Sequence, residues 1–417
     1  MTELGEIPSE WEVKNIGEVA KFQGGYAFKS SDYVEDGIRL VKITNAQQKN
    51  ISWNEEDLLP VKYLEKFNEY KLQEDDVVIA MTRPIISTGI KVCKIEKRDL
   101  PCLLNQRVGR FIIKDLLISK YLYNYCFTDY FINKVKELCS TTGQPNISAN
   151  QIESILITIP SVKEQEKITS ILSTVDEQID NVDALIEKNK ELKKGLMQTL
   201  LTKGIGHTKF KTTEIGEIPE EWQVKRLGNV CEVKSSKRVY QSDYIDSGVP
   251  FYRSKEIIEL SKGNLPTVEL FIARDKFEEF KEKYGVPKLG DLMITSVGSV
   301  GKTWVCDGRE FYYKDGNLTQ IISNNEINTK YISYVFECEY LIKQYLGQSS
   351  GSAQVALTLE KLKNLLVIFP TIDEQVSIVN ILLSIDKKIE EYENKKKKLE
   401  ELKKGLMQQL LTGKIRV

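Results

Sequence analysis

The chain has 417 residues and a formal net charge of −1, with 59 Lys and Arg against 60 Asp and Glu. This length fits two or three domains, since one domain typically takes roughly 150 residues. Residues 1–11 carry no basic and apolar leader, and no apolar run reaches the roughly 18 residues that cross a bilayer, so we expect a cytoplasmic protein.

The numbers and positions of histidine and cysteine exclude several kinds of catalytic and metal site. The only histidine, His207, falls in a glycine-bearing connector, and we expect it to be a solvated linker residue. One histidine in a connector makes neither a Ser-His-Asp triad nor a zinc-binding HExxH helix. The seven cysteines are widely spread and never form a CxxC pair, so we expect reduced, mostly buried thiols rather than disulfides or a zinc site.

The chain is an internal repeat with a period of about 210 residues. Residues 2–19 and 213–230 share 12 of 18 positions around a common GEIPxxW opening. Residues 191–205 and 401–415 share 12 of 15 positions, around ELKKGLMQ and LLT. Each repeat is therefore predicted to be one structural unit, present twice.

Both repeats predict the same order of elements. Strand-like segments come first, at 37–44, 76–82, 89–95 and 107–113 in the first repeat and at 291–297, 302–307 and 318–323 in the second. A helical stretch with aromatic spacing follows, over 120–138 and 330–346, and we expect its tyrosines to pack in the core. These tyrosines are Tyr121, Tyr125, Tyr331 and Tyr334. Each globular part, 1–159 and 212–369, is predicted to be α+β.

A long helix is predicted after each globular part, within 160–211 and 370–417. Each helix begins after a proline with an S/T-x-x-E capping box, formed by Ser161 with Glu164 and by Thr371 with Glu374. Apolar residues then alternate at spacings of four and three, which is typical of a coiled-coil seam. The seam comprises Ile168, Leu172, Val175, Ile179, Val182 and Ile186 in the first helix and Ile378, Leu382, Ile385, Ile389 and Tyr392 in the second.

The natural partner of the first helix is the second, because they are copies on one chain. Related by a pseudo-twofold axis, they would pack as an antiparallel coiled coil with a globular part at each end. About 40 residues at ~1.5 Å per residue give a rod of roughly 60 Å. Leu196, Met197, Leu406 and Met407, near the helix tips, are candidates for docking a partner protein, with coiled-coil core packing as the alternative interpretation.

Residues 296–303, SVGSVGKT, end like a phosphate-binding loop. A Walker A loop needs glycine at its first position and a helix after it, whereas this chain has Ser296 and a strand-like TWV. We therefore expect a strand-turn-strand loop. Signatures of adenine methylation, dinucleotide binding and nuclease chemistry are also missing, so we expect no catalytic residue and no metal ligand on this chain.

Polar loops in the globular parts are the remaining candidates for binding. Arg and Lys reach the acceptors of guanine, and Asn and Gln pair with the edge of adenine. The candidate DNA-binding residues are Arg83, Asn105, Gln106, Arg107, Thr142, Gln144 and Asn146 in the first repeat and Lys237, Arg238, Arg253, Ser296, Ser299, Lys302, Ser349, Ser350 and Gln354 in the second. The acidic balance of each globular part means that a local basic face or other subunits would have to supply phosphate contacts.

Taken together, the motifs resemble a specificity subunit of a type I restriction-modification system. The resemblance covers essentially the whole chain. It rests on the duplicated GEIPxxW opening, the paired P…EQ helix entries (Pro160, Glu164, Gln165 and Pro370, Glu374, Gln375) and the twin ELKKGLMQ helix ends. It implies two target recognition domains, 1–159 and 212–369, each reading one half of a split site in double-stranded DNA. The helical conserved regions, 160–211 and 370–417, would separate the domains and dock methyltransferase subunits.

The resemblance also implies that the enzymatic activities belong to other subunits. Methylation with S-adenosylmethionine would belong to two methyltransferase subunits. Cleavage with ATP and Mg would belong to restriction and translocase subunits, and no cofactor would bind this chain. The helix pair would then act as a ruler for the gap between half-sites. One alternative of another class stays open: a pseudo-symmetric coiled-coil adaptor that binds proteins and has no DNA role.

Overall fold

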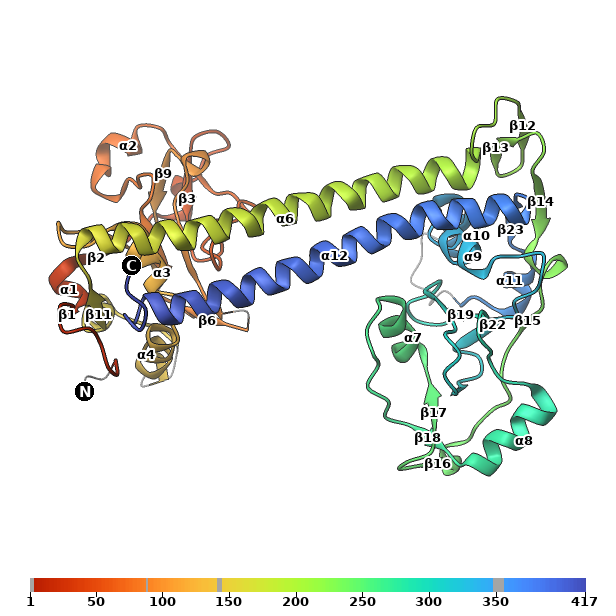
Figure 1. The fold of residues 1–417 in the computed structure, drawn as a ribbon. Coiled ribbons are helices and arrows are strands. Elements are labelled where there is room, and N and C mark those ends of the chain that lie inside the picture. The colour runs from red at the N-terminus through yellow and green to blue at the C-terminus, as the bar shows by residue number, and fades with distance from the viewer. Residues whose placement is uncertain (1–3, 88, 141–144, 348–355) are drawn as a thin grey trace. The chain divides into compact units, whose positions relative to one another are not determined.

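The structure is a computed structural model that describes residues 4–87, 89–140, 145–347 and 356–417. The chain folds into two compact units (Figure 1). Unit 1 comprises Met1–Asp183 and Asn394–Val417, and unit 2 comprises Ala184–Glu393. The sequence-derived globular domains 1–159 and 212–369 each lie inside one unit. Each sequence-derived helical region, by contrast, contributes residues to both units.

Unit 1 is built round an antiparallel sheet of order β2-β10-β5-β8. Its strands are β2 (Ala20–Gly24), β10 (Val108–Ile113), β5 (Val77–Ala80) and β8 (Val92–Lys94). Smaller sheets join β1 (Glu12–Asn15) to β11 (Leu156–Ile159), β3 (Ile38–Val41) to β4 (Leu58–Leu59) and β9 (Cys102–Leu104), and β6 (Ile85–Ile86) to β7 (Gly89–Ile90). The helices are α1 (Ile16–Val19), α2 (Tyr63–Lys66), α3 (Ser119–Tyr125), α4 (Asp129–Ser140) and α5 (Ala149–Glu153), with short η1 (Ser30–Asp32), η2 (Asn68–Tyr70) and η3 (Lys97–Asp99).

Unit 2 repeats this plan with an antiparallel sheet of order β15-β22-β19-β20. Its strands are β15 (Val233–Lys234), β22 (Leu318–Ile321), β19 (Leu292–Thr295) and β20 (Thr303–Val305). The other strands are β12 (Phe210–Thr213), β13 (Gly216–Pro219), β14 (Gln223–Arg226), β23 (Leu366–Phe369), β16 (Tyr244–Ile245), β18 (Phe271–Ile272), β17 (Val249–Tyr252) and β21 (Tyr312–Tyr313). The helices are α7 (Ser254–Ser261), α8 (Arg274–Tyr284), α9 (Thr329–Val335), α10 (Glu339–Leu346) and α11 (Leu359–Asn364), with short η4 (Leu227–Asn229) and η5 (Gln241–Asp243). The mixed content confirms the α+β prediction.

Two long helices, α6 (Val162–Lys203) and α12 (Ile372–Leu410), pair in antiparallel fashion within each unit (Figure 1). In unit 1, Lys403 forms an ion pair with Asp176, and Lys396 pairs with Asp183 at 2.7 Å. Between these two ion pairs the position moves seven residues forward along α6 and seven residues back along α12. This is the register of an antiparallel helix pair. In unit 2, Lys193 pairs with Asp386 at 2.7 Å. None of the described helices is both long and apolar enough to span a membrane.

The coiled-coil seam contributes to the core of each unit. The predicted positions from Ile168 to Ile186 on α6 and from Ile378 to Ile385 on α12 are buried, while Ile389 and Tyr392 are half-buried. Met197 and Met407 are also buried against the cores of unit 2 and unit 1, respectively. The core interpretation of these two methionines is therefore confirmed. The tyrosines predicted to pack in the core are buried as well, and so are all seven cysteines.

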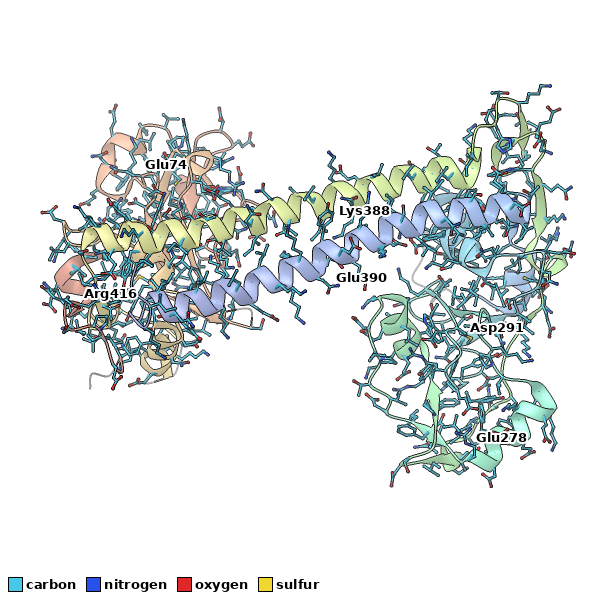
Figure 2. All side chains as sticks on the ribbon, in the orientation of Figure 1. Glu74, Glu278, Asp291, Lys388, Glu390 and Arg416 are labelled. Carbon is cyan, nitrogen blue, oxygen red and sulfur yellow. The ribbon has the colours of Figure 1, made fainter. Side chains whose placement is uncertain are left out.

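The glutamate at the start of each long helix bonds to residues from distant segments of its unit instead of completing a capping box. Ser161 Oγ accepts from the backbone N–H of Glu164 at 3.3 Å, as predicted. The Glu164 carboxylate, however, accepts from Trp11 Nε1 at 3.1 Å and from Arg416 Nε at 2.6 Å (Figure 2 labels Arg416). Within the described residues the capping box is thus only half formed, because long-range donors occupy the carboxylate. The GEIPxxW and P…EQ motifs therefore meet each other in space.

The same arrangement in unit 2 corrects the prediction for His207. Glu374 Oε2 accepts from Trp222 Nε1 at 2.8 Å, and Glu374 Oε1 lies 2.9 Å from His207 Nε2. The His207 side chain is only 16% exposed and its ring packs edge-on against Trp222. The expectation of a solvated linker residue was wrong, because the connector after α6 folds back onto the entry of α12.

The glutamine of each helix entry ties the long helix to the globular part. Gln165 is fully buried and donates to the carbonyls of Leu116 and Pro160, while its Oε1 accepts from the N–H of Ile118 at 3.0 Å. Gln375 repeats this pattern with Asn328, whose N–H donates to Gln375 Oε1 at 2.9 Å. Since Ile118 and Asn328 are the N-caps of α3 and α9, each glutamine sets the start of a core helix.

Each predicted aromatic helix is two helices in the structure. In unit 1 a break separates α3 from α4, where Thr128 Oγ1 donates to the carbonyl of Tyr125 at 2.8 Å and accepts from the N–H of Phe131 at 3.3 Å. A threonine that bonds both neighbouring turns ends one helix and caps the next. The turn of the chain at this point brings both helices against the same core.

Candidate nucleic-acid interface

Three loops of unit 1 meet at one end of its central sheet. The N–H of Met81 donates to the carbonyl of Arg107 at 2.7 Å, and the N–H of Ile147 donates to the carbonyl of Met81 at 2.8 Å. The N–H of Arg83 donates to the carbonyl of Pro145 at 2.7 Å. We call the combined surface of residues 81–83, 105–107 and 145–147 loop edge 1. Five of the seven candidates in the first repeat lie on it, and Thr142 and Gln144 lie outside the described residues.

Unit 2 has a matching surface built from the same positions of the repeat. The N–H of Ser296 donates to the carbonyl of Asn317 at 2.8 Å, and the N–H of Leu357 donates to the carbonyl of Ser296 at 2.8 Å. Ser296, Asn317 and Leu357 thus take the places of Met81, Arg107 and Ile147. Loop edge 2 is defined as residues 296–302, 315–317 and 356–358. Ser349, Ser350 and Gln354 belong to the adjoining stretch that the structure does not describe.

Loop edge 1 carries two arginines in a strained backbone conformation. Arg83 has φ 47° and Arg107 has φ 67°, in the left-handed region that favours glycine. For a residue with a Cβ this conformation costs roughly 1–2 kcal/mol. Such strain is found where the surrounding structure holds a side chain in place for function.

In the part of the chain that the structure describes, these two arginines are also the ones without a side-chain partner. Nine of the eleven arginines donate a hydrogen bond or form an ion pair within the chain. Within the described residues Arg83 and Arg107 do neither, and both are exposed. An exposed guanidinium keeps all five donors available to a planar acceptor or a phosphate.

The amide side chains of loop edge 1 divide into two kinds. Gln106 is exposed, while its backbone N–H donates to the carbonyl of Tyr26 at 2.8 Å. Asn105 is only 9% exposed, and its Oδ1 has no hydrogen-bond partner among the described residues. The Oδ1 of the half-buried Asn146 also lacks one. Each carboxamide therefore keeps an acceptor that a donor from a ligand could satisfy.

On loop edge 2 some of the candidate side chains are exposed and one is buried. Lys302 and Ser299 are exposed in the turn between β19 and β20, whereas Ser296 is buried and hydrogen-bonds Thr319 at 2.8 Å. Lys302 and Thr303 pair with β19, so the predicted strand-turn-strand loop is confirmed. A pocket of about 420 Å³ opens beside Ser296 and is lined by Ser235, Gly316, Thr319 and residues 356–360.

The three remaining candidates of the second repeat differ in the contacts that their side chains make. Lys237 is exposed and its Nζ lies over the ring of Tyr284. Arg238 is 66% exposed and pairs with Asp315 at 2.9 Å, which places it beside loop edge 2. Arg253 is held by the buried Glu256 at 2.8 Å and by Glu269 at 2.9 Å. Ion pairing raises the pKa of Arg253, and its guanidinium is committed to these carboxylates.

Asn317 is the residue on loop edge 2 that reasoning from the sequence missed. It occupies the place of Arg107, and no hydrogen bond of its carboxamide is present among the described residues. The period of about 210 residues, counted from Arg107, would have found it. The side chain at this place is thus a guanidinium in one unit and a carboxamide in the other.

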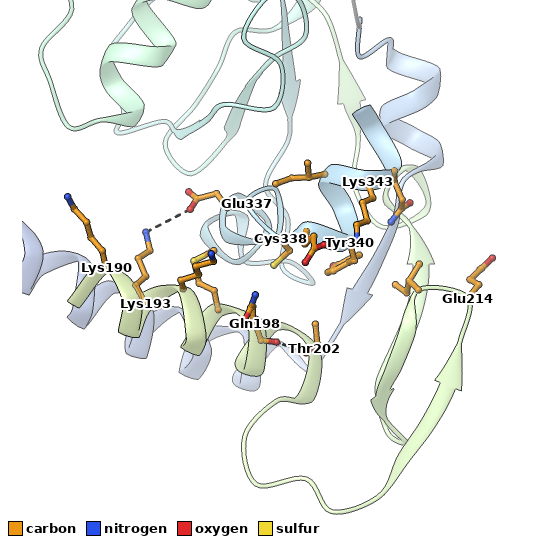
Figure 3. Close-up of a pocket in the computed structure, with 15 residues that line it drawn as sticks. Lys190, Lys193, Gln198, Thr202, Glu214, Glu337, Cys338, Tyr340 and Lys343 are labelled. Atoms are coloured by element: carbon orange, nitrogen blue, oxygen red, sulfur yellow. Dashed lines mark hydrogen bonds and ion pairs between the residues drawn. The ribbon is translucent and has the colours of Figure 1, made fainter. Parts of the chain in front are cut away.

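A larger pocket of about 1010 Å³ lies in unit 2 between α6, α10 and the turn of the β12–β13 hairpin (Figure 3). Its lining includes Lys190, Lys194, Met197 and Tyr340, and it contains none of the candidate DNA-binding residues. In unit 1, Gln408 donates to Asp129 at 2.9 Å. At the repeat period of 210 residues, Gln408 corresponds to Gln198 and Asp129 corresponds to Glu339, and both Gln198 and Glu339 line the pocket.

The described residues contain no cluster of three or more His, Cys, Asp or Glu placed to hold a metal ion.

Comparison with known proteins places both repeats in one family. The model of the type I restriction modification DNA specificity domain matches residues 8–192 and 219–401. The MjaVIII specificity subunit of Methanocaldococcus jannaschii is 29% identical, over 99% of this chain and 94% of that protein. The EcoAI specificity subunit of Escherichia coli is 32% identical over 47% of this chain and 33% of its own length.

Solved structures share the fold at lower identity. A chain from work on complex assembly and conformational transition of the type I R-M system matches with a TM-score of 0.60 and 19% identity, covering 98% of this chain and all of that one. The type I S subunit from M. genitalium matches with a TM-score of 0.56 and 16% identity, covering 99% of this chain and 98% of that one. The chain therefore belongs to the type I restriction-modification DNA specificity family, as a non-catalytic specificity subunit with two recognition domains.

Proposed function

We propose that each unit reads one half of a bipartite DNA sequence through its loop edge. The observation that carries this proposal is the pair Arg83 and Arg107 at one end of a sheet. Both have a left-handed backbone and an exposed side chain that has no partner among the described residues. Folding gains nothing from strain that glycine would avoid. A ligand that binds both guanidinium groups would account for the strained backbone and for the lack of side-chain partners among the described residues.

The chemistry of loop edge 1 fits the major groove of DNA. Arginine donates two parallel hydrogen bonds to O6 and N7 of guanine, and a carboxamide pairs with N6 and N7 of adenine. Arg83, Arg107 and Gln106 present both kinds of group on one exposed surface. Asn146 would extend the same surface, whereas the candidates Thr142 and Gln144 lie outside the described residues.

Loop edge 2 would read a different half-site, because its chemistry differs. Asn317 stands where Arg107 stands in unit 1, and a pocket whose lining includes Ser235, Gly316 and Thr319 opens next to it. Lys302, Ser299, Lys237 and Arg238 would contribute contacts from the neighbouring turns. A site that is recognised in two unlike halves has no palindromic symmetry, even though the protein scaffold repeats.

We further propose that α6 and α12 set the number of unread base pairs between the half-sites. The regular antiparallel register of Asp176 with Lys403 and of Asp183 with Lys396 supports a stiff pair in unit 1. Adding one heptad to each helix keeps the seam in phase and should lengthen the unread gap. Methylome mapping that returned an unchanged gap would remove the ruler role.

The partners and cofactors follow from the same proposal. Two methyltransferase subunits would dock on the outward faces of the helices and bind S-adenosylmethionine. Restriction and translocase subunits would use ATP and Mg. The complex would act in the cytoplasm, where cysteine thiols stay reduced.

The proposal is tested in the complete complex with its methyltransferase subunits. After the modified sequence has been mapped, Arg83→Ala and Arg107→Ala are assayed for binding to a duplex that contains it. We expect each variant to lose discrimination at the first half-site by about 1–3 kcal/mol per lost guanine contact. Arg98→Ala is the matched control, because Arg98 is exposed in the same unit but already pairs with Glu96.

The opposite result would be equally clear. If Arg83→Ala and Arg107→Ala bound and methylated the mapped site as the parent chain does, loop edge 1 would not be the reading surface. If no complex showed salt-sensitive, sequence-dependent affinity for DNA, the protein adaptor would become the better account.

A further inference from the structure

The strained arginines of loop edge 1 have a third basic neighbour. Within the described residues, four residues other than glycine have a left-handed backbone: Lys49 with φ 71°, Asp75 with φ 67°, Arg83 and Arg107. Three of these four are basic. Reasoning from the sequence did not nominate Lys49, because it lies in a separate loop more than thirty residues before Arg83.

The backbone of Lys49 belongs to the same end of the central sheet. Its N–H donates to the carbonyl of Val92 at 2.8 Å, and Val92 pairs with Ile79 near the end of β5. The N–H of Ala80, one residue further on, donates to the carbonyl of Lys91 at 3.0 Å. Since β5 leads directly into Met81 of loop edge 1, Lys49 stands beside that edge across β8.

The backbone of the loop around Lys49 is in contact with neighbouring residues, whereas the Lys49 side chain is exposed. The phenol of Tyr123 donates to the carbonyl of Lys49 at 3.4 Å. Next to it, the backbone of Gly89 approaches the carboxamide of Gln48 so closely that a Cβ there would lie 2.4 Å from Gln48 Nε2. The Lys49 side chain is exposed, and no ion pair of its ammonium occurs in the part of the chain that the structure describes.

Lys49 also lies close to the helix pair of unit 1. Burial lowers the pKa of Lys403 on α12, although Asp176 opposes this shift, and the positive charge of Lys49 lowers it further. Burial likewise raises the pKa of Tyr123, and the charge of Asp176 adds to that rise. Tyr123 thus contacts the Lys49 loop and also lies near Asp176 of α6. Lys49 stands at the corner where loop edge 1 meets the helices.

We propose that Lys49 holds a phosphate of the DNA backbone next to the first half-site, on the side that faces the helix pair. A lysine ammonium is a compact point charge that binds phosphate without reading a base. The contact would fix the register of loop edge 1 on the duplex. This inference rests on the proposed function, and it adds a positioning residue that leaves the recognised sequence unchanged.

The experiment uses the full chain in complex with its methyltransferase subunits and a duplex that carries the mapped site. Lys49→Gly removes the charge and relieves the left-handed backbone at the same time, whereas Lys49→Arg keeps the charge. We expect Lys49→Gly to be at least as heat-stable as the parent chain and to bind DNA about three- to tenfold more weakly at physiological salt. The slope of log K against log salt should fall by about one phosphate contact.

Two further readouts separate a phosphate contact from a structural role. The methylated sequence should stay the same in Lys49→Gly, and Lys49→Arg should restore the affinity. Ethylation of single phosphates should interfere with the parent complex at a phosphate beside the first half-site and should no longer do so in Lys49→Gly. Asp75→Gly is the matched control, because it relieves the same backbone strain beyond the opposite end of β5 and should leave DNA binding unchanged.

The outcomes distinguish this inference from the proposal on which it rests. If Lys49→Gly bound as the parent chain does while Arg107→Ala lost discrimination, the role of Lys49 would be overturned and loop edge 1 would stand. If Lys49→Gly changed the methylated sequence, Lys49 would read a base, and the phosphate assignment would be wrong. If neither Lys49→Gly nor Arg107→Ala changed binding, the proposed function itself would fail.

Discussion

Arg416 and Glu164 are 252 residues apart in the chain, yet their Nε and Oε1 atoms lie 2.6 Å apart. Arg416 follows α12, and Glu164 is in the first turn of α6. The last residues of the chain thus close the unit that contains its first residues. In unit 2, His207 and Glu374 make the corresponding closure at 2.9 Å, with the connector after α6 in the place of the C-terminal segment.

Removing the closure of unit 1 should destabilise it. Arg416→Ala leaves the buried Glu164 carboxylate with Trp11 as its single side-chain donor among the described residues, and it should lower the free energy of unfolding of unit 1. Urea denaturation of the full chain measures this loss. Lys414→Ala, two residues away at an exposed position, should change it by less than about 0.5 kcal/mol. Equal effects of the two substitutions would contradict the closure.

The Asp176–Lys403 pair should respond differently to the loss of each partner. The Lys403 side chain is 10% exposed and the Asp176 side chain is 38% exposed. Asp176→Ala would strand a buried ammonium and should cost about 3 kcal/mol of unfolding free energy. Lys403→Met would leave a solvated carboxylate and should cost less than about 1 kcal/mol.

The Asp183–Lys396 pair supplies the control in the same unit. Both of its side chains are about a third or more exposed, so Asp183→Ala should cost less than about 1 kcal/mol. A thermal unfolding series of Asp176→Ala, Lys403→Met and Asp183→Ala compares the three. If Asp183→Ala proved as harmful as Asp176→Ala, burial would not decide the energetics of the helix pair.

Asn317 should determine part of the second half-site and nothing in the first. Asn317→Ala removes the carboxamide that replaces the Arg107 guanidinium and should lose about 1–3 kcal/mol of discrimination at one base pair. Asn317→Arg should shift the preference at that base pair toward guanine. Methylome mapping of cells that express each variant shows which half-site changes. A change confined to the first half-site would refute the assignment of loop edge 2.

Arg253 should act mainly on the stability of unit 2. Its guanidinium is the ion-pair partner of the Glu256 carboxylate, and Glu256 is 1% exposed. Arg253→Ala therefore leaves a buried charge without its partner and should cost about 2 kcal/mol of unfolding free energy. A normal melting curve together with weakened DNA binding would instead support the base-reading role predicted from the sequence.

Glu269 should make the stability of unit 2 depend on acidity. Hydrogen bonds from Lys255 and Arg253 lower the pKa of Glu269 to about 2. A carboxyl whose pKa is lower in the folded state stabilises the fold above its unfolded pKa of about 4.3, and this contribution is lost as the pH falls toward 2. The parent chain should therefore melt higher than Glu269→Gln at pH 6, and the difference should shrink between about pH 4.5 and pH 2. A difference that stayed constant over this range would exclude the ion pair as its cause.

The elements that the sequence predicted well depend on short stretches of chain. Ser161 and Thr371 cap the long helices because a cap needs only the next three residues. The burial of Tyr121 and Tyr331 follows from their helical spacing beside apolar neighbours. The strand-turn-strand loop after Ser296 follows from its glycines and the strand-like residues that come next.

The misjudged elements depend on partners far away in the chain. His207 was expected to be solvated because it lies in a glycine-bearing connector, but its ring contacts Glu374 and Trp222. Glu164 and Glu374 looked like halves of capping boxes, but distant donors take their carboxylates. Lys49 could not be nominated from its neighbours, since only strand pairing places it beside the other residues of loop edge 1. The neighbours of Asn317 do not mark it either, although the repeat period counted from Arg107 leads to it.

The amino-acid order alone determined that this protein is a duplicated α+β chain with two long amphipathic helices, because repetition and periodicity are properties of the chain itself. The tertiary structure decided which side chains meet, since it pairs each helix with the other and brings separate loops to one end of a sheet. The left-handed backbone of Arg83 and Arg107, and the lack of side-chain partners for them among the described residues, belong to the second kind of information. A backbone angle and a missing partner exist only once distant segments have packed.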